Sequence, residues 1–533
     1  MPRYSGGQAV VRSLLSEGVR AVFGIPGVHN LDIYDALIDA PEIGHYVARH
    51  EQGAAFMADG YARATGKPGV CLPITGPGLT NMATAVAEAY ANSSPLVVIS
   101  SEIESHLIGK QKGALHEMKD QRAFASTITK WSMHLSRVRE IPEAIRRAFR
   151  AQVGERPRPV HIQIPVDVLG AEDEVEFPEP VPPSLPVPAE EHLARASTVI
   201  LDARKPVIYA GGGALQSNAG PQLLELSALL GAPILTSIMG KGVVPDSEPL
   251  VLGTLAQDER VADALTQADL MIAVGTRFGG AASRHWRLQV PERLIHIDID
   301  RAEISRHFRA EVELVGDAQT TLKAVLELLK RRVGSPRQPW LGVQNLKSEL
   351  RERLDREGSW EWRCQKAIRQ ALPADAITVW DMTVLSYAAC RQFPVYSPRS
   401  FLFPRGFGTL GFALPAALGA KVAHPRRAVL AVCGDGGFMF TCQELATAAH
   451  YRLPICVLLV NSNGYHVVKR NQLRRFGRSI DVDLTNPDFG KLADSFGVSY
   501  ARVKDPEELL PALRSALQSD IPTLVEIPFP DSE

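Results

Sequence analysis

Two oxygen-bearing side chains near the C-terminal end of the chain are placed to bind a metal ion together with phosphate. Residues 428–433 and 455–460 are apolar runs of strand length, separated by a helical pattern. Asp435 follows the first run and Ser462 the second, so in a βαβ unit both lie at the carboxyl ends of neighbouring parallel strands, where open α/β sheets bind ligands. Mg²⁺ prefers oxygen ligands and commonly shares its coordination shell with phosphates. We therefore predict a magnesium and diphosphate site, with a turn at 434–437 whose glycines admit the phosphates; a plain strand-to-helix turn would need the same glycines.

A carboxylate at the start of a predicted helix near the N-terminus is the second candidate for chemistry. Glu51 precedes the helical pattern of residues 52–63, within the run His50-Glu51-Gln52-Gly53-Ala54-Ala55. A positioned glutamate can act as a general acid or base. The alternative is that it only stabilises the helix, since a negative charge in the first turn gains roughly 0.3–1 kcal/mol from the helix dipole.

Taken together, the two segments resemble the acetolactate synthase type of thiamine diphosphate enzyme, a family of 2-oxo acid decarboxylases and carboligases. The resemblance is carried by residues 50–66 and by Gly434-Asp435-Gly436 with the later Asn461-Ser462-Asn463, and it extends over nearly the whole chain. It implies thiamine diphosphate and Mg²⁺ as cofactors, with Glu51 bound to the aminopyrimidine ring and Asp435, Ser462 and the Gly464 carbonyl bound to the metal. The family has asparagine at position 462, and the weaker serine ligand puts metal affinity in question.

The resemblance also names further cofactor-binding residues. Residues 75–81 are similar to the family's glycine-rich loop near the cofactor, and residues 406–412 to the segment that holds the cofactor bent, with Leu410 between the two rings and the Gly408 carbonyl as an acceptor. An ordinary helix-opening turn and a core leucine would have the same sequence. The cofactor-binding residues implied are Gly27, Thr75, Gly78, Asn81, Gly408, Leu410, Gly434, Asp435, Gly436, Gly437 and Tyr465.

Two further loops, residues 24–31 and 115–121, resemble family loops that face the substrate. They imply His29 and His116 as proton-shuttling catalytic residues, a role that suits a side chain titrating near neutrality. Both could instead be structural histidines. The substrate contacts implied are Val28, His29, Asn30, His116 and Gln121. These loops are more similar to 5-guanidino-2-oxopentanoate decarboxylase than to acetolactate synthases, which have glutamine near position 116.

From this resemblance we expect non-oxidative decarboxylation of a 2-oxo acid to an aldehyde through an enamine intermediate. The alternative is a carboligase of the acetolactate synthase type, which passes the enamine to a second carbonyl. A more remote alternative is a cofactor-binding protein without turnover. Residues 275–281 resemble the flavin-binding segment of acetolactate synthases but lack its paired aspartates, so FAD stays open as a further cofactor. No long C-terminal tail is present, and we expect any lid to come from residues 469–481.

The pattern along all 533 residues predicts an α/β fold with three doubly wound parallel-sheet domains. We place an N-terminal pyrimidine-binding domain at 1–170 and a proline-rich linker at 171–189. A central α/β domain follows at 190–335, where Gly211-Gly212-Gly213 is interpreted as a plain turn, since Gln216 breaks the GxGxxG pattern. A linker helix at 336–359 leads to the diphosphate-binding domain at 360–533.

Bulk properties favour small-molecule chemistry. The net charge is −1, which gives no electrostatic reason to expect a nucleic acid or a membrane as partner. The six cysteines show no CxxC spacing, the N-terminus shows no cleavable signal, and no apolar run reaches about 20 residues, so we expect a cytoplasmic protein. In the family, the two ends of the cofactor are bound by domains from two subunits. A homodimer is therefore the smallest expected assembly, and a homotetramer the expected one.

Overall fold

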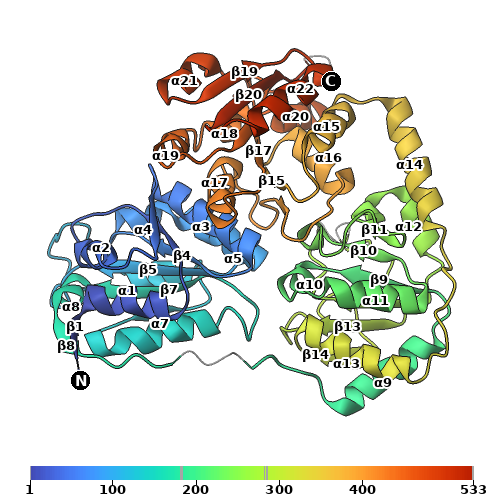
Figure 1. Ribbon diagram of the computed structural model, residues 1–533, viewed down its shortest axis with the longest axis horizontal. Coiled ribbons are helices and arrows are strands. Elements are labelled where there is room, and N and C mark those ends of the chain that lie inside the picture. Colours follow the sequence, from blue (N-terminus) through green and yellow to red (C-terminus); the bar gives the residue numbers. More distant parts are fainter. Residues whose placement is uncertain (1, 180–183, 281–282, 284–285, 531–533) are drawn as a thin grey trace. The chain divides into compact units, whose positions relative to one another are not determined.

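The computed structural model describes residues 2–179, 184–280, 283 and 286–530, and it contains three α/β domains (Figure 1). Each domain is built on a six-stranded parallel sheet. The strand orders are β3-β2-β4-β5-β7-β6, β11-β10-β9-β12-β13-β14 and β16-β15-β17-β18-β20-β19. The predicted fold class is confirmed.

The N-terminal sheet has six strands, of which those at residues 44–47 and 132–134 are half-buried and the other four are buried between helices. The strands are β2 (Ala21–Gly24), β3 (Gly44–Val47), β4 (Gly69–Leu72), β5 (Leu96–Glu102), β6 (Ser132–His134) and β7 (Val160–Pro165). Successive side chains alternate between two apolar cores: Cys71 and Val98 belong to one, Val70 and Val97 to the other. Strands buried on both faces appear in sequence as continuous apolar runs, which is why β4 and β5 could be predicted.

The helices of this domain carry four of the predicted site residues, Glu51, Gly78, Asn81 and Gln121. They are α1 (Gly6–Ser16), α2 (Leu31–Ile38), α3 (Glu51–Thr65), α4 (Pro77–Asn81), α5 (Ala83–Asn92), α6 (Gln121–Ser126), α7 (Ile141–Arg150) and α8 (Val166–Gly170). Loops at the carboxyl ends of β2 and β4 lead directly into α2 and α4, so the sheet sets the positions of both loops.

The C-terminal domain contains the predicted βαβ unit. Its strands are β15 (Ile377–Trp380), β16 (Phe401–Leu402), β17 (Val429–Gly434), β18 (Cys456–Asn461), β19 (Ser499–Arg502) and β20 (Thr523–Pro528). Its helices are α15 (Trp360–Ala371), α16 (Val384–Gln392), α17 (Ala413–Ala423), α18 (Asp435–Phe438), α19 (Glu444–His450), α20 (His466–Phe476), α21 (Phe489–Ser495) and α22 (Pro506–Leu517). The segment predicted as a simple turn at 434–437 is corrected to a helical turn, α18, because its amides point along a helix axis at the end of β17.

The N-terminal domain and most of the C-terminal domain form one compact unit, in which α3 packs closely on α17. A Cβ atom on Gly60 would lie 2.0 Å from the Ala416 carbonyl oxygen, and one on Gly419 would lie 1.8 Å from that of Met57. Both distances are impossible for real atoms, so glycine is required wherever the two helix backbones meet. This contact joins the helix that begins with Glu51 to the C-terminal sheet.

The second compact unit comprises residues 184–376 and 384–401. Its sheet consists of β9 (Pro206–Ala210), β10 (Ile234–Thr236), β11 (Val251–Gly253), β12 (Leu270–Val274), β13 (Leu294–Asp298) and β14 (Val312–Val315). Its helices include α9 (Glu190–Asp202), α10 (Gly212–Gln216), α11 (Gly220–Leu230), α12 (Glu259–Leu265), α13 (Ala318–Lys330) and α14 (Val343–Glu357). The glycines at 211–213 form the connection from β9 into α10, as the turn interpretation predicts.

The predicted linkers show more structure than their composition suggests. Residues 172–174 form strand β8 (Glu172–Glu174), which pairs antiparallel with β1 (Arg3–Ser5), so this part of the predicted extended linker is corrected to a strand. Residues 180–183 of that linker, residue 281 of the flavin-like segment and residues 531–533 lie outside the described residues. No helix in the described ranges is long and apolar enough to cross a membrane. The exact domain boundaries stay predictions.

Candidate active site

Glu51 is the first residue of α3 and is held by a side chain from the neighbouring loop. The Asn81 amide donates to Glu51 Oε2 over 2.9 Å. The other carboxylate oxygen, Oε1, faces Gly78, where a Cβ atom would lie 3.5 Å away. Three predicted site residues, Glu51, Gly78 and Asn81, are therefore brought together, with one carboxylate oxygen fixed and the other turned toward the glycine-rich loop.

The N-terminus of α3 is held by Glu444, a residue that the sequence did not single out. Its carboxylate lies at the start of α19 and accepts from the backbone amides of Arg49 and His50, each at 3.1 Å, and from the Thr447 hydroxyl at 2.7 Å. Gly53 makes room for it, because a Cβ there would lie 2.3 Å from Glu444 Oε1. Burial raises the pKa of Glu444 to about 7, against the lowering effect of these hydrogen bonds. The position of Glu51 therefore depends on a carboxylate from the C-terminal domain.

Buried polar side chains anchor the glycine-rich loop between β4 and α4. Thr75 donates its backbone amide and hydroxyl to the Ser101 hydroxyl, at 3.0 and 2.9 Å. Gln121 accepts from the Gly76 amide at 2.8 Å and donates to the Ser101 carbonyl at 2.8 Å. The Gln121 amide group is thus engaged with the loop itself, and its predicted contact with substrate stays a prediction.

His29 and His116 lie next to each other, as the two loops that carry them predict. Their ring centroids are 5.1 Å apart, and the Nδ1 atoms of both are buried without a hydrogen-bond partner among the described residues. Burial lowers the pKa of His29, and the neighbouring His116 lowers it further, whereas Glu104 acts in the opposite direction. The His116 backbone has φ 67° and packs over Gly76, which connects this pair to the glycine-rich loop.

The 24–31 loop is braced by its own asparagine. Asn30 Oδ1 accepts from the Gly27 amide at 2.8 Å, and its Nδ2 faces the carbonyls of Ile25 and Leu72 at 3.4 and 3.5 Å. Gly27 lies tightly against Ile74, and Val28 is exposed. The structure therefore uses Asn30 to shape the loop, while its predicted substrate contact and that of Val28 stay predictions.

The three predicted metal ligands lie together at the carboxyl ends of β17 and β18. Ser462 Oγ is 3.1 Å from Asp435 Oδ1 and 2.9 Å from the Gly464 carbonyl oxygen. Ligands at 2.0–2.1 Å in an octahedron place neighbouring oxygens roughly 2.9 Å apart, so this spacing fits Mg²⁺. The other Asp435 oxygen is occupied by the Gly464 amide at 2.9 Å and the Asn486 amide at 2.8 Å. Oδ1 is therefore the oxygen turned toward the other two candidate ligands.

The glycines around Asp435 lie close against neighbouring side chains. A Cβ on Gly436 would lie 2.6 Å from the Tyr465 ring, and one on Gly434 would lie 3.2 Å from the Thr383 hydroxyl. A Cβ on Gly437 would lie 3.2 Å from the Asp381 carboxylate. These close approaches leave little room for a side chain at 434, 436 or 437, and the predicted binding of phosphates at the start of α18 stays a prediction.

The 406–412 segment is bound by two buried carboxylates from different domains. Glu88 on α5 accepts from the Gly408 amide at 2.9 Å, and Asp381 after β15 accepts from the Gly411 amide at 3.1 Å. Burial raises the pKa of Asp381 to about 6. Both glycines have positive φ, 78° and 79°, and no described residue donates to the Gly408 carbonyl. Leu410 is half-buried, consistent with a side chain that is not committed to the core.

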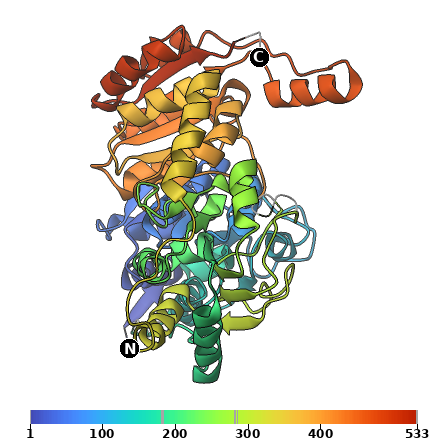
Figure 2. The same cartoon turned by 90° about the vertical axis from the view of Figure 1, so that its right-hand side faces the viewer.

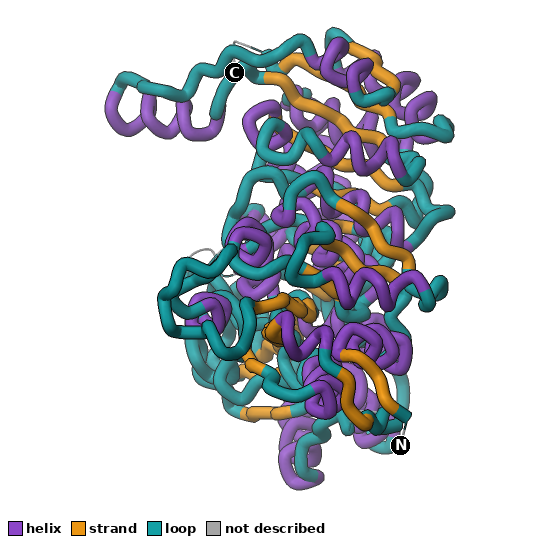
Figure 3. The backbone as a smooth tube through the Cα atoms, turned by 90° about the vertical axis from the view of Figure 1, so that its left-hand side faces the viewer, coloured by secondary structure: helices purple, strands orange, loops and turns teal. Residues whose placement is uncertain are grey.

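Two other predicted features concern residues 275–281 and 469–481. Residues 275–280 follow β12 and include no acidic side chain that could bind a flavin. Phe278 in this stretch is buried and stacks on Tyr209. Helix α20, within the predicted lid, has no buried residue and projects from the C-terminal sheet (Figures 2 and 3). FAD binding and the lid role stay predictions.

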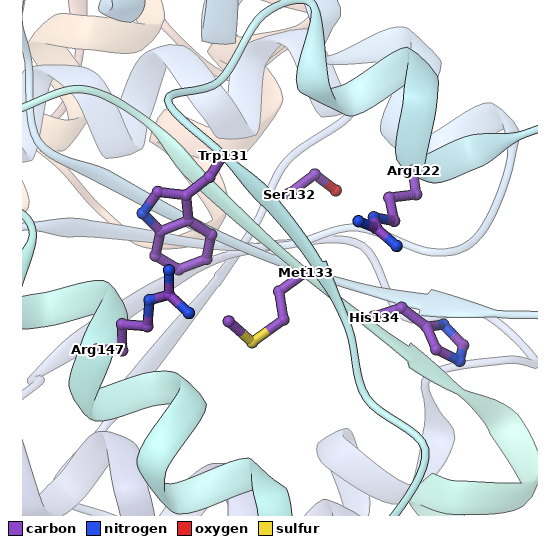
Figure 4. A pocket seen from close by; sticks show the side chains of 6 residues that line it. All are labelled: Arg122, Trp131, Ser132, Met133, His134 and Arg147. Atoms are coloured by element: carbon purple, nitrogen blue, oxygen red, sulfur yellow. The ribbon is translucent and has the colours of Figure 1, made fainter.

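A separate pocket of about 290 Å³ lies at the edge strand β6 (Figure 4). Its lining residues are Arg122, Trp131, Ser132, Met133, His134 and Arg147. The Arg147 guanidinium stacks over Trp131 at 5.3 Å. None of the predicted site residues lines it.

Four residues that support the site could not be recognised from sequence: Glu88, Asp381, Glu444 and Asn486. The first three are buried acids within apolar helices or strand ends, and each acts on backbone amides of distant segments. A buried acid within an apolar segment is unusual and can be noticed in a sequence. The sequence does not show which backbone amides that acid binds.

The chain matches the thiamine pyrophosphate enzyme models for the N-terminal TPP-binding domain at 4–124, the central domain at 193–325 and the C-terminal TPP-binding domain at 381–527. It is 42% identical to the probable 2-ketoarginine decarboxylase AruI of Pseudomonas aeruginosa, over 98% of this chain and 94% of that protein. It is 36% identical to a probable acetolactate synthase large subunit of Methanocaldococcus jannaschii, over 99% of this chain and 92% of that protein. It is also 36% identical to the acetolactate synthase isozyme 3 large subunit of Escherichia coli, over 97% of this chain and 93% of that protein. The chain therefore belongs to the thiamine pyrophosphate enzyme family.

Proposed function

We propose that this enzyme decarboxylates a 2-oxo acid to an aldehyde without oxidation, using thiamine diphosphate and Mg²⁺. When bound, thiamine diphosphate would supply a carbon nucleophile for the 2-oxo carbonyl and an acceptor for the electrons left when CO₂ departs. Asp435, Ser462 and the Gly464 carbonyl would hold the metal, and the amides of α18 would hold the diphosphate. The single observation that carries the proposal is the fixed orientation of Glu51, with Oε2 bound to Asn81 and Oε1 turned toward Gly78.

Glu51 has the geometry to exchange a proton with a ring nitrogen of the cofactor. The Asn81 bond removes its freedom to rotate, and Glu444 fixes the helix end on which it stands. A proton donor or acceptor held in one orientation contributes typically 10²–10⁴-fold to rate. On the substrate side, His29 and His116 would supply and accept protons, since their unpartnered Nδ1 atoms are free to do so within the described structure.

Within this function, we propose a substrate with a positively charged side chain. Glu117 Oε2 accepts from the amides of Gly113 and Ala114, at 2.7 and 3.1 Å, while its Oε1 is buried without a partner among the described residues. A buried carboxylate oxygen with no donor is costly unless a ligand supplies one. Glu104 acts electrostatically on His29, so negative charge lies close to the histidine pair. The name of the Pseudomonas aeruginosa relative, a 2-ketoarginine decarboxylase, agrees with such a substrate.

The test is a substrate panel run with the wild type and with Glu51→Gln. The panel contains 5-guanidino-2-oxopentanoate, the uncharged 2-oxooctanoate of similar length, and pyruvate, and the readouts are CO₂, aldehyde and acetolactate. We expect aldehyde from the guanidino acid, with kcat/KM at least tenfold above that for 2-oxooctanoate, and loss of at least 100-fold in Glu51→Gln.

A second variant tests the charge preference separately. Glu117→Gln should lower kcat/KM for the guanidino acid about tenfold and leave kcat/KM for 2-oxooctanoate nearly unchanged. Only the positively charged guanidino group of the substrate loses the negative charge of Glu117. Acetolactate as the main product from pyruvate would establish the carboligase instead. Bound cofactor with no turnover of any acid in the panel would favour a binding protein.

A further inference from the structure

Glu88 makes an unusual contact between the two cofactor-binding domains of one chain. It lies on α5 of the N-terminal domain and is fully buried. Its Oε2 accepts from three successive backbone amides of the C-terminal domain, those of Phe407, Gly408 and Thr409, at 3.2, 2.9 and 3.4 Å. A carboxylate that gathers consecutive amides fixes the path of the backbone more tightly than any single bond does.

The same carboxylate is held from its other side. Its Oε1 accepts from the Asn92 amide and lies 3.9 Å from Arg63 Nη2. Arg63 in turn pairs with Asp59, with Nη2 2.7 Å from Oδ2, and donates to the Phe403 carbonyl at 2.9 Å. Both ends of the 403–409 stretch are therefore bound to one buried charge cluster, the Glu88 cluster, formed by Asp59, Arg63 and Glu88.

Burying this cluster carries a cost that ordinary packing does not explain. Asp59 and Glu88 have no exposed side-chain surface, and they share one cation. Burial raises the pKa of Glu88, and its amide partners at Gly408 and Thr409 offset part of that effect. Charged groups are rarely buried unless they are fully paired, and replacing such groups by apolar ones is often neutral or stabilising. Retention of the charge here points to a role beyond stability.

We propose that Glu88 is a positioning residue that holds the Gly408 carbonyl in place for the cofactor. The inference depends on the proposed function and on the predicted role of residues 406–412 in binding thiamine diphosphate. Gly408 is in the left-handed region, with φ 78°, so its peptide has no intrinsic preference for this one orientation. By fixing the amide of Gly408 and those on either side, Glu88 presets the direction of the free carbonyl and lowers the entropic cost of binding.

Hydrogen–deuterium exchange of the full-length protein without cofactor tests the clamp directly. Removal of the carboxylate in Glu88→Ala should speed exchange of the 407–409 amides at least tenfold. Asn92→Ala is the matched control, because it removes a partner of Oε1 and leaves the three amides on Oε2. In Asn92→Ala, the exchange rates of the 407–409 amides should stay within twofold of those in the wild type. Unchanged protection in Glu88→Ala would overturn the proposal.

Calorimetric titration with thiamine diphosphate and Mg²⁺ tests the consequence for the cofactor. We expect the Kd to rise at least tenfold in Glu88→Ala and to stay within twofold in Asn92→Ala. Glu88→Gln keeps a weaker oxygen acceptor, so it should partly rescue both properties, with changes of about threefold to fivefold. If Glu88→Ala does not fold, Glu88→Gln decides, and a wild-type Kd together with wild-type exchange in that variant would refute the role.

The two proposals fail in different ways. A wild-type protein that does not bind thiamine diphosphate would contradict the proposed function. A wild type that binds normally, alongside a Glu88→Ala variant with fast amide exchange but an unchanged Kd, would refute only the positioning role of Glu88.

Discussion

At the proposed metal site, Ser462 offers a hydroxyl oxygen in place of an amide or carboxylate oxygen. Its hydroxyl is neutral and can donate to only one of its two neighbours, Asp435 Oδ1 and the Gly464 carbonyl, at a time. Binding of a cation would leave that proton without either acceptor, because both oxygens would face the metal. The hydroxyl therefore has the correct position for a ligand but a weaker donor strength than an amide oxygen.

Substitution of Ser462 should change the requirement for metal more than the fold. In Ser462→Ala, the Mg²⁺ concentration for half-maximal binding of thiamine diphosphate should rise at least tenfold, because one of three protein ligands is lost. Ser462→Asn restores an amide oxygen and should lower that concentration below the wild-type value. Titration of cofactor binding against Mg²⁺ measures both. An unchanged requirement in Ser462→Ala would show that this hydroxyl is not a ligand.

Helix α3 connects Glu51 to the 403–409 stretch within one chain. Glu444 holds the backbone at its N-terminus, next to Glu51, and the Glu88 cluster surrounds Arg63 near its C-terminus. Between them, Gly60 lies against α17 without space for a side chain. Because it is bound along its length, α3 cannot shift at one end without straining contacts at the other.

The pKa of Glu444 predicts how stability depends on pH. A carboxyl group whose pKa is raised from 4.5 to about 7 binds more protons in the folded state than in the unfolded state across that window. Its contribution to the free energy of unfolding is therefore complete below about pH 4.5 and is lost as the pH rises through about 7, by at most about 3 kcal/mol. Glu444→Gln removes the titration while keeping an acceptor for the amides.

Urea unfolding at pH 5 and pH 8 measures this effect. The decrease in the free energy of unfolding between the two pH values should be smaller in Glu444→Gln than in the wild type. The same decrease in both proteins would show that Glu444 titrates near its ordinary value.

At the scale of the whole molecule, the proposed site needs residues from both domains of the larger compact unit. Glu51 stands in the N-terminal domain, and Asp435 stands in the C-terminal domain. We propose that each working site combines these domains from two chains, so that a homodimer is the minimum enzyme. Closed two-fold assemblies are the commonest form of such sharing.

Mixing of two inactive variants tests this assembly. Glu51→Gln and Asp435→Ala should each be inactive alone. If sites are shared, random reassociation makes half of the dimers mixed, and each mixed dimer has one intact site, so about a quarter of the wild-type activity should return. The mixture is unfolded and refolded together, and the variants refolded separately serve as controls. No recovery despite mixed dimers would mean that each site is formed within one chain.

Parallel sheets gave the clearest sequence signal, since strands buried on both faces are continuous apolar runs. The approach of Asp435 to Ser462 could be predicted for the same reason, because neighbouring parallel strands end at one edge of a sheet. Glu88 and Glu444 could not be assigned in this way. Their partners lie more than 300 positions away, and a carboxylate bonded to backbone amides places no requirement on the partner's side chain. The oxygen spacing at the proposed metal site and the orientation of Glu51 follow from packing within a domain, and the clamp on Gly408 follows from packing between two domains. Only the tertiary structure specifies either kind of packing.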